Sequence, residues 1–106
     1  MKQVVYKYCL ADPVEESDAE NVYHFPPDAK LLHVGTQENQ IFMWVLHPNL
    51  NALTPQEGSV KWVISPVFTG ETFEPSPEDL FIGTTIQVWS AHHSTVIHWF
   101  KREETV

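Results

Sequence analysis

The chain has 106 residues, which suits one domain, and no linker, repeat or low-complexity segment divides residues 1–106. Fourteen acidic residues against six lysines and arginines give a formal charge of −8, which disfavours binding to nucleic acid or anionic membranes. Cys9 is the only cysteine, which excludes an intrachain disulfide and a zinc cluster built on thiolates. With no signal-peptide pattern at the N-terminus, this cysteine usage predicts a cytoplasmic protein.

The first half of the chain predicts short strands separated by turns. Residues 3–10 alternate in polarity, which is typical of a strand with one buried face. Residues 21–25 predict a second strand, and the segment 26–28 predicts a turn because it holds two prolines and an aspartate. Strands are expected at 31–36 and 41–46, joined by a hairpin turn at 37–40 in which Asn39 adopts a left-handed conformation.

The second half predicts three more strands and little helix. Strands are expected at 60–65, extending towards Phe68, at 80–90 and at 95–101, with a hairpin loop at 91–94. Segments 12–15, 54–57 and 76–79 each place a capping side chain before proline and an acid two residues after it. They predict a helix of two turns over 13–20 and single turns at the other two places.

Two of these strands are apolar on both faces. Residues 41–46 and 96–100 lack the alternation of a one-sided sheet, so we expect them to be central and covered twice. The fold is therefore predicted to be all-β and mainly antiparallel. It is a single-domain β-sandwich or curved barrel-like sheet of about seven strands, with one or two very short helices. Apolar faces of this kind also predict a homodimer or larger homo-oligomer.

Several spaced elements resemble a known family. They are Lys7-Tyr8, Pro27-x-Ala29-Lys30-x-Leu32-His33-Val34-Gly35-x-Gln37, Trp44, Thr69-Gly70, Phe81-Ile82-Gly83-Thr84 and Ile97-His98-Trp99-Phe100. In this order the chain resembles a family of small phage and prophage proteins of unknown function. The resemblance implies a phage origin and an unassigned role, and it supplies no catalytic residue.

Recognised catalytic patterns are absent from the sequence. The four glycines lie too far apart for a phosphate loop, and no nucleophile elbow is present. His33 and His98 fall within predicted strands, but a metal site needs a third ligand. Cys9 is expected to be a small buried apolar residue. We predict no catalytic residue, no metal and no cofactor, and we favour a non-catalytic protein.

Five residues of the family pattern form the candidate ligand- or partner-binding site: Gln37, Trp44, Thr69, Thr84 and His98. They predict a polar rim around an aromatic floor made by Trp44, Trp89 or Trp99. The alternative is structural: these residues fix turns and strand ends, with Gly70 at a tight turn and Gly83 at a bulge. Counting from the loop at 91–94 places His98 opposite residues 87–89, sharing a face with Thr84 without touching it.

The favoured function is that of a phage-encoded binding protein that inhibits a host enzyme or defence factor. One alternative is a sponge that sequesters a small molecule such as a nucleotide signal. A small hydrolase using histidine and an accessory protein of the virion are further alternatives. A host protein or a small ligand is therefore the expected partner, with no direct binding to nucleic acid or membrane.

Overall fold

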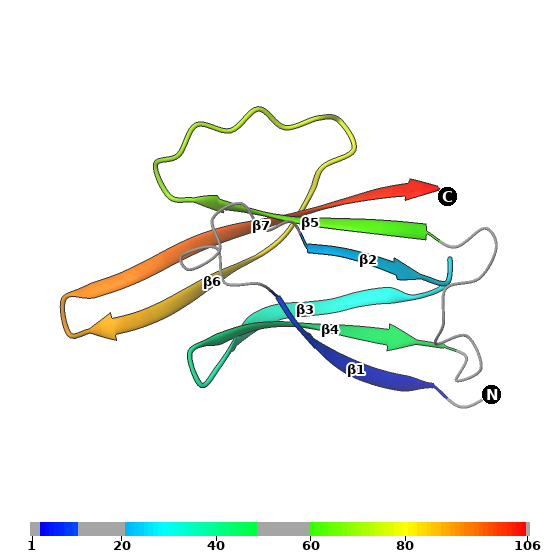
Figure 1. Cartoon of the computed structure of the whole chain (residues 1–106), viewed down its shortest axis with the longest axis horizontal. Helices are drawn as coiled ribbons and strands as arrows, with labels where there is room; N and C mark the ends of the chain where they lie inside the picture. The colour runs from blue at the N-terminus through cyan, green and yellow to red at the C-terminus, as the bar shows by residue number, and fades with distance from the viewer. Residues whose placement is uncertain (1–2, 11–20, 49–59, 106) are drawn as a thin grey trace.

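The computed structural model describes residues 3–10, 21–48 and 60–105, which form seven strands and contain no helix (Figure 1). The strands are β1 (Val4–Cys9), β2 (Asn21–Phe25), β3 (Lys30–Gln37), β4 (Gln40–His47), β5 (Val60–Phe68), β6 (Leu80–Ser90) and β7 (His93–Thr105). The all-β prediction is confirmed. The predicted helix over 13–20 and the predicted turn at 54–57 lie outside the described residues. At 76–79 a single turn forms, in which the Asp79 amide donates to the Ser76 carbonyl (3.0 Å).

The strands form two antiparallel sheets that pack as a sandwich and do not close into a barrel (Figure 1). The three-stranded sheet has the order β1-β4-β3, and the four-stranded sheet has the order β2-β5-β7-β6. β4 and β7, the two strands predicted to be central, each have a neighbour on both sides.

The core lies between the sheets and is built from alternate residues of their strands. On β4 the inward residues Ile41, Met43 and Val45 are buried. They share one hydrophobic cluster with Ile97 and Trp99 of β7. Other members of this cluster, from the remaining strands and the segment after β1, are Leu10, Phe25, Val34, Trp62 and Ile64.

Turn chemistry accounts for two of the connections. At the β3–β4 hairpin Glu38 and Asn39 both have positive φ (52° and 64°), as a two-residue hairpin with the favoured twist requires. The left-handed Asn39 was predicted from the sequence. Gly70 has a φ of 87° in the turn after β5, where the Glu71 amide donates to the Phe68 carbonyl (3.0 Å). The tight turn predicted at Gly70 is therefore confirmed.

The β6–β7 hairpin is longer than predicted and has a different register. β7 begins at His93 instead of residue 95 and ends at Thr105 instead of residue 101. A register shift between Val88 and Ser90 adds a further offset, so His98 pairs with Thr84 and not with residues 87–89. The pairing of β5 with β7 stops at Ile97. The end of the hairpin beyond it, residues 86–96, is called the arm below, and it projects at the left of Figure 1.

His47 on β4 is the buried histidine among those described, and it makes stability depend on pH. It is 1% exposed, its Nε2 lies 3.0 Å from the Tyr8 hydroxyl, and the rings of Tyr6 and Phe25 pack against it edge-on. Burial lowers the pKa of His47 below 6.5, and the nearby Asp28 carboxylate opposes this shift only in part. The unfolded chain therefore takes up this proton at a higher pH than the folded one.

We accordingly expect the free energy of unfolding to be highest above about pH 6.5 and to fall as pH drops from there to the lowered pKa of His47. Urea unfolding at several pH values measures this dependence. His47→Gln should flatten the profile in that window, whereas His92→Gln, in the exposed hairpin turn, should leave it unchanged. A profile as steep in His47→Gln as in the parent would assign the dependence to other groups.

Candidate functional site

The five residues of the predicted site fall into two clusters on opposite outer faces of the sandwich. Three of them meet on the four-stranded sheet. The ring of His98 lies between two threonine hydroxyls, with Nδ1 3.0 Å from Thr84 Oγ1 and Nε2 2.9 Å from Thr69 Oγ1. Thr84 and His98 therefore touch, contrary to prediction, because they are direct partners in the β6–β7 ladder.

This cluster ties together three parts of the four-stranded sheet. Thr84 lies on β6, His98 on β7, and Thr69 follows β5. A neutral imidazole has one donor and one acceptor, and a hydroxyl serves either, so both ring nitrogens are satisfied. This arrangement fixes the ring and leaves neither nitrogen available for a substrate proton, which supports the structural alternative for these three residues.

The other two predicted residues lie on the outer face of the three-stranded sheet. Gln37 Oε1 accepts a hydrogen bond from Lys7 Nζ (2.7 Å), and the same ammonium lies 4.5 Å from the centre of the Phe42 ring. Trp44 is half-buried on this face, between Phe42 and His33 (ring centroids at 6.2 and 5.4 Å). Cys9 also lies on this face and is exposed, so its predicted burial is wrong.

The three tryptophans offered as a common floor are in three separate places. Trp99 is fully buried in the core, where its indole N–H donates to Thr85 Oγ1 (2.8 Å). Trp89 is 44% exposed on the arm, and Trp44 lies on the outside of the three-stranded sheet. The structure therefore does not bring the predicted residues into one aromatic-floored site.

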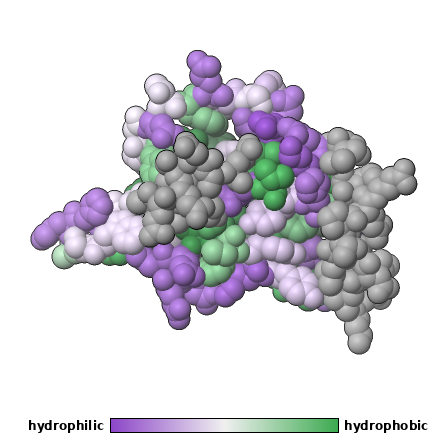
Figure 2. Space-filling model, in the orientation of Figure 1, coloured by the Kyte–Doolittle hydropathy of each residue, from purple (hydrophilic) through white to green (hydrophobic). Residues whose placement is uncertain are grey.

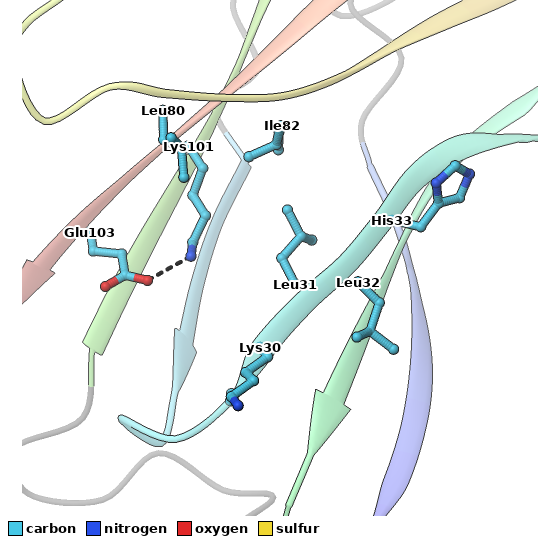
Figure 3. A pocket seen from close by; sticks show the side chains of 9 residues that line it. Lys30, Leu31, Leu32, His33, Leu80, Ile82, Lys101 and Glu103 are labelled. Atoms are coloured by element: carbon cyan, nitrogen blue, oxygen red, sulfur yellow. Dashed lines mark hydrogen bonds and ion pairs between the residues drawn. The ribbon is translucent and has the colours of Figure 1, made fainter.

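A groove opens where the edge strands of the two sheets, β3 and β6, separate (Figure 3). At one end the strands are joined, because the Asn39 side chain donates to the Val88 carbonyl (2.9 Å) and accepts from the Val88 amide (3.0 Å). Nearer the middle, Gly83 lies against Val34. Beyond that point residues 29–33 of one edge, with Leu80 and Ile82 of the other, line a hollow of about 470 Å³.

The walls of this groove are aliphatic, and each contains a β-bulge. β3 shifts register between Leu31 and His33, and β6 shifts between Phe81 and Gly83, so Leu32 and Ile82 are the extra residues. Figure 3 shows Leu31 and Ile82 directed towards each other across the opening. Bulges re-aim side chains and interrupt strand pairing, so these edges are poorly suited to adding another strand.

The polar groups of the groove are Lys30, His33, Lys101 and Glu103. Lys101 occupies an inward position on β7, two residues after the buried Trp99, and its side chain is only 11% exposed. Its ammonium lies 2.5 Å from Glu103 Oε1 and 3.8 Å from the centre of the Trp62 ring. A lysine at a position where the strand pattern calls for an apolar residue is a candidate binding group.

The arm carries exposed apolar side chains on both of its faces. Ile86 and Val88, two residues apart, share one face and are 52% and 59% exposed. Trp89 lies on the other face, where its indole N–H donates to Thr95 Oγ1 (2.9 Å). Figure 2 shows the end of the arm projecting at the left, with hydrophobic residues among the hydrophilic ones.

The family model described as a domain of unknown function (DUF7352) matches residues 1–106. The chain belongs to this family. Its family membership therefore assigns no activity. None of the curated proteins matches the chain, and neither does any solved structure.

In the ranges that the structure describes, no group of three or more His, Cys, Asp or Glu side chains is placed to hold a metal ion. Nor does this part of the chain contain a helix long and apolar enough to span a membrane.

Sequence reasoning missed both the groove and the arm. The residue that could have indicated the groove is Lys101. It is a charged side chain at an inward position of the strand, at the same two-residue spacing as the buried Ile97 and Trp99. The signal for the arm was length, since the 80–90 strand exceeds the strand predicted at 60–65, so the end of its hairpin extends beyond that strand.

Proposed function

We propose that this domain is a non-catalytic, phage-encoded binding protein that acts on a host enzyme or defence factor in the cytoplasm of the infected bacterium. The observation that carries the binding role is the arm, which presents Ile86, Val88 and Trp89 to solvent beyond the end of β5. The phage origin is supported by the residue pattern described above, and the compartment by the single cysteine.

The arm has the properties of a protein contact surface. Exposed apolar side chains grouped on one element are typical of partner surfaces. Tryptophan is enriched among the residues that contribute most to binding, and the hydrogen bond to Thr95 holds Trp89 in one orientation. β6 is also the edge strand of its sheet, but on the arm the Asn39 side chain occupies the backbone groups of Val88, so the exposed side chains, and not the strand edge, are the surface offered to a partner.

We expect the double variant Ile86→Asp, Val88→Asp to lose its protein partner while keeping its fold, since both side chains are more than half exposed. The measurement is affinity capture from bacterial lysate, followed by mass spectrometry and binding assays with the purified partner. Trp89→Ala should weaken the same complex by tenfold or more, the effect of losing about 1.4 kcal/mol.

The matched control is Val22→Asp, which places the same charge on an exposed valine of β2, far along the sheet from the arm. It should bind like the parent protein. Equal capture by the arm variant and by the control would rule out the arm as the contact surface.

A homodimer or larger homo-oligomer remains part of the proposal. It is supported by the outer face of the three-stranded sheet, where Val5 is 49% exposed and Phe42, Trp44 and Leu46 are half-buried. Light scattering on the same samples measures the oligomeric state.

The alternative of a small-molecule sponge has one supporting feature, the groove between β3 and β6. Its walls hold no aromatic ring other than that of His33, and nucleotide bases are usually held by aromatic stacking. The groove therefore favours a ligand with an aliphatic body over a nucleotide base.

A further inference from the structure

The groove between β3 and β6 has a composition that selects among ligands. Its apolar lining is wholly aliphatic: Ala29, Leu31, Leu32, Leu80 and Ile82. Its volume of about 470 Å³ lies within the range of pockets that bind small molecules. Aliphatic walls suit a flexible aliphatic body and offer no face on which a planar ring would stack.

The charges of the groove favour an anion with a single charge. Lys30 and Lys101 against Glu103 leave one net positive charge, in a chain whose net charge is −8. Glu103 is 52% exposed, so it can turn towards solvent and release the Lys101 ammonium. An adjoining hollow of about 330 Å³ is lined by Lys101 together with the two carboxylates of Glu78 and Glu103, which repel an anion there and favour the β3 side of Lys101.

The position of Lys101 is costly for a purely structural residue. Removing an ammonium from water is unfavourable, and a pair such as Lys101–Glu103 is often no more stabilising than apolar side chains of the same size. The Trp62 ring beneath the ammonium holds it at the floor of the groove, where it faces a ligand entering between Leu31 and Ile82 (Figure 3).

We propose that this groove binds a small aliphatic monocarboxylate, of the medium-chain fatty acid class, with its carboxylate on Lys101 and its chain between Leu31 and Ile82. The binding is independent of the protein partner of the arm. The two bulges, which make these edges unsuitable for an added strand, favour this occupant over an extended peptide.

Isothermal titration calorimetry of the full chain with decanoate tests this proposal, with decan-1-ol and decyltrimethylammonium as probes of the same length. Decanoate should bind with one molecule per chain, and at least about tenfold more tightly than either probe, as expected when a charge-assisted hydrogen bond is lost. Equal binding of all three probes, or no binding of decanoate up to about 1 mM, would overturn it.

Variants separate the role of Lys101 from folding. Lys101→Met should weaken decanoate binding at least about tenfold and leave decan-1-ol binding unchanged. Lys101→Arg, which keeps the positive charge, should keep the affinity for decanoate. The matched control is Lys61→Met, which removes a lysine paired with Glu104 outside the groove. Leu31→Trp, which fills the wall, should reduce the binding of all three probes. Decanoate binding that survives Lys101→Met unchanged would contradict the proposal.

Discussion

Replacing Trp99 by alanine is expected to unfold this domain or to lower its melting temperature by more than about 12 °C. Trp99 is fully buried at the centre of the sandwich, and substitutions of this kind cost about 3–5 kcal/mol. The change also removes the donor to Thr85 Oγ1, itself a buried group that then lacks its partner. A small domain has a total stability of only about 5–15 kcal/mol, and each 1 kcal/mol is worth about 4–8 °C.

Thermal unfolding followed by circular dichroism measures this effect, and a second tryptophan supplies the control. Trp89→Ala removes the same side chain from an exposed site on the arm and should shift the melting temperature by no more than a few degrees. The melting temperature of Trp99→Phe should lie between those of Trp99→Ala and Trp89→Ala, since phenylalanine keeps most of the buried volume but loses the hydrogen bond to Thr85. Similar melting temperatures for Trp99→Ala and Trp89→Ala would show that the core tolerates a large cavity.

The strands were predictable because their signals are local. Alternation at 3–10, the prolines at 26 and 27 and the left-handed Asn39 each act within a few residues, and the structure has strands or turns at all of these places. Unbroken apolar runs also identified β4 and β7 as central, since each has a neighbouring strand on both sides. The predicted second cover is not seen in the part of the chain that the structure describes, where the outward residues Phe42, Trp44 and Phe100 are half-buried.

Register was not predictable, because it depends on single-residue details. The β6–β7 turn is shorter than expected, and the bulge near Trp89 adds one more residue of offset. Together these place His98 beside Thr84, and a contact between side chains on neighbouring strands depends entirely on that register. The sequence therefore grouped Thr69, Thr84 and His98, which the structure also brings together, but with the wrong register, and it grouped them with Gln37 and Trp44, which lie on the other sheet.

The groove and the exposed arm arise only from the way that the two sheets meet. Whether β3 and β6 join or separate depends on contacts between residues about 50 positions apart along the chain, such as Asn39 with Val88. A sequence pattern shows that Ile86 and Val88 belong to a strand, and it does not show that β5, on the other side of β7, stops before the arm begins.

The contact between Asn39 and Val88 joins the two sheets, which makes Asn39 a position of large expected effect despite its exposure. The side-chain amide of Asn39 makes two hydrogen bonds with the Val88 backbone. The backbone carbonyl of Asn39 accepts a third hydrogen bond, from Gln87 Nε2 (2.9 Å). Asn39 also has a φ of 64°, a conformation that asparagine tolerates better than other residues with a Cβ.

Asn39→Ala should therefore cost about 2–3 kcal/mol, from two lost hydrogen bonds of about 0.5–1.5 kcal/mol each and the strain of alanine at positive φ. Asn39→Gly removes the hydrogen bonds without the strain and should cost less, and Asn39→Asp keeps the acceptor for the Val88 amide and should cost least. Hydrogen exchange distinguishes this clamp from a local turn effect, because the Val88 amide should lose protection in the alanine and glycine variants and keep it in the aspartate variant. If the Val88 amide stays protected in Asn39→Ala, then other contacts hold β3 and β6 together, and the closed end of the groove does not depend on this side chain.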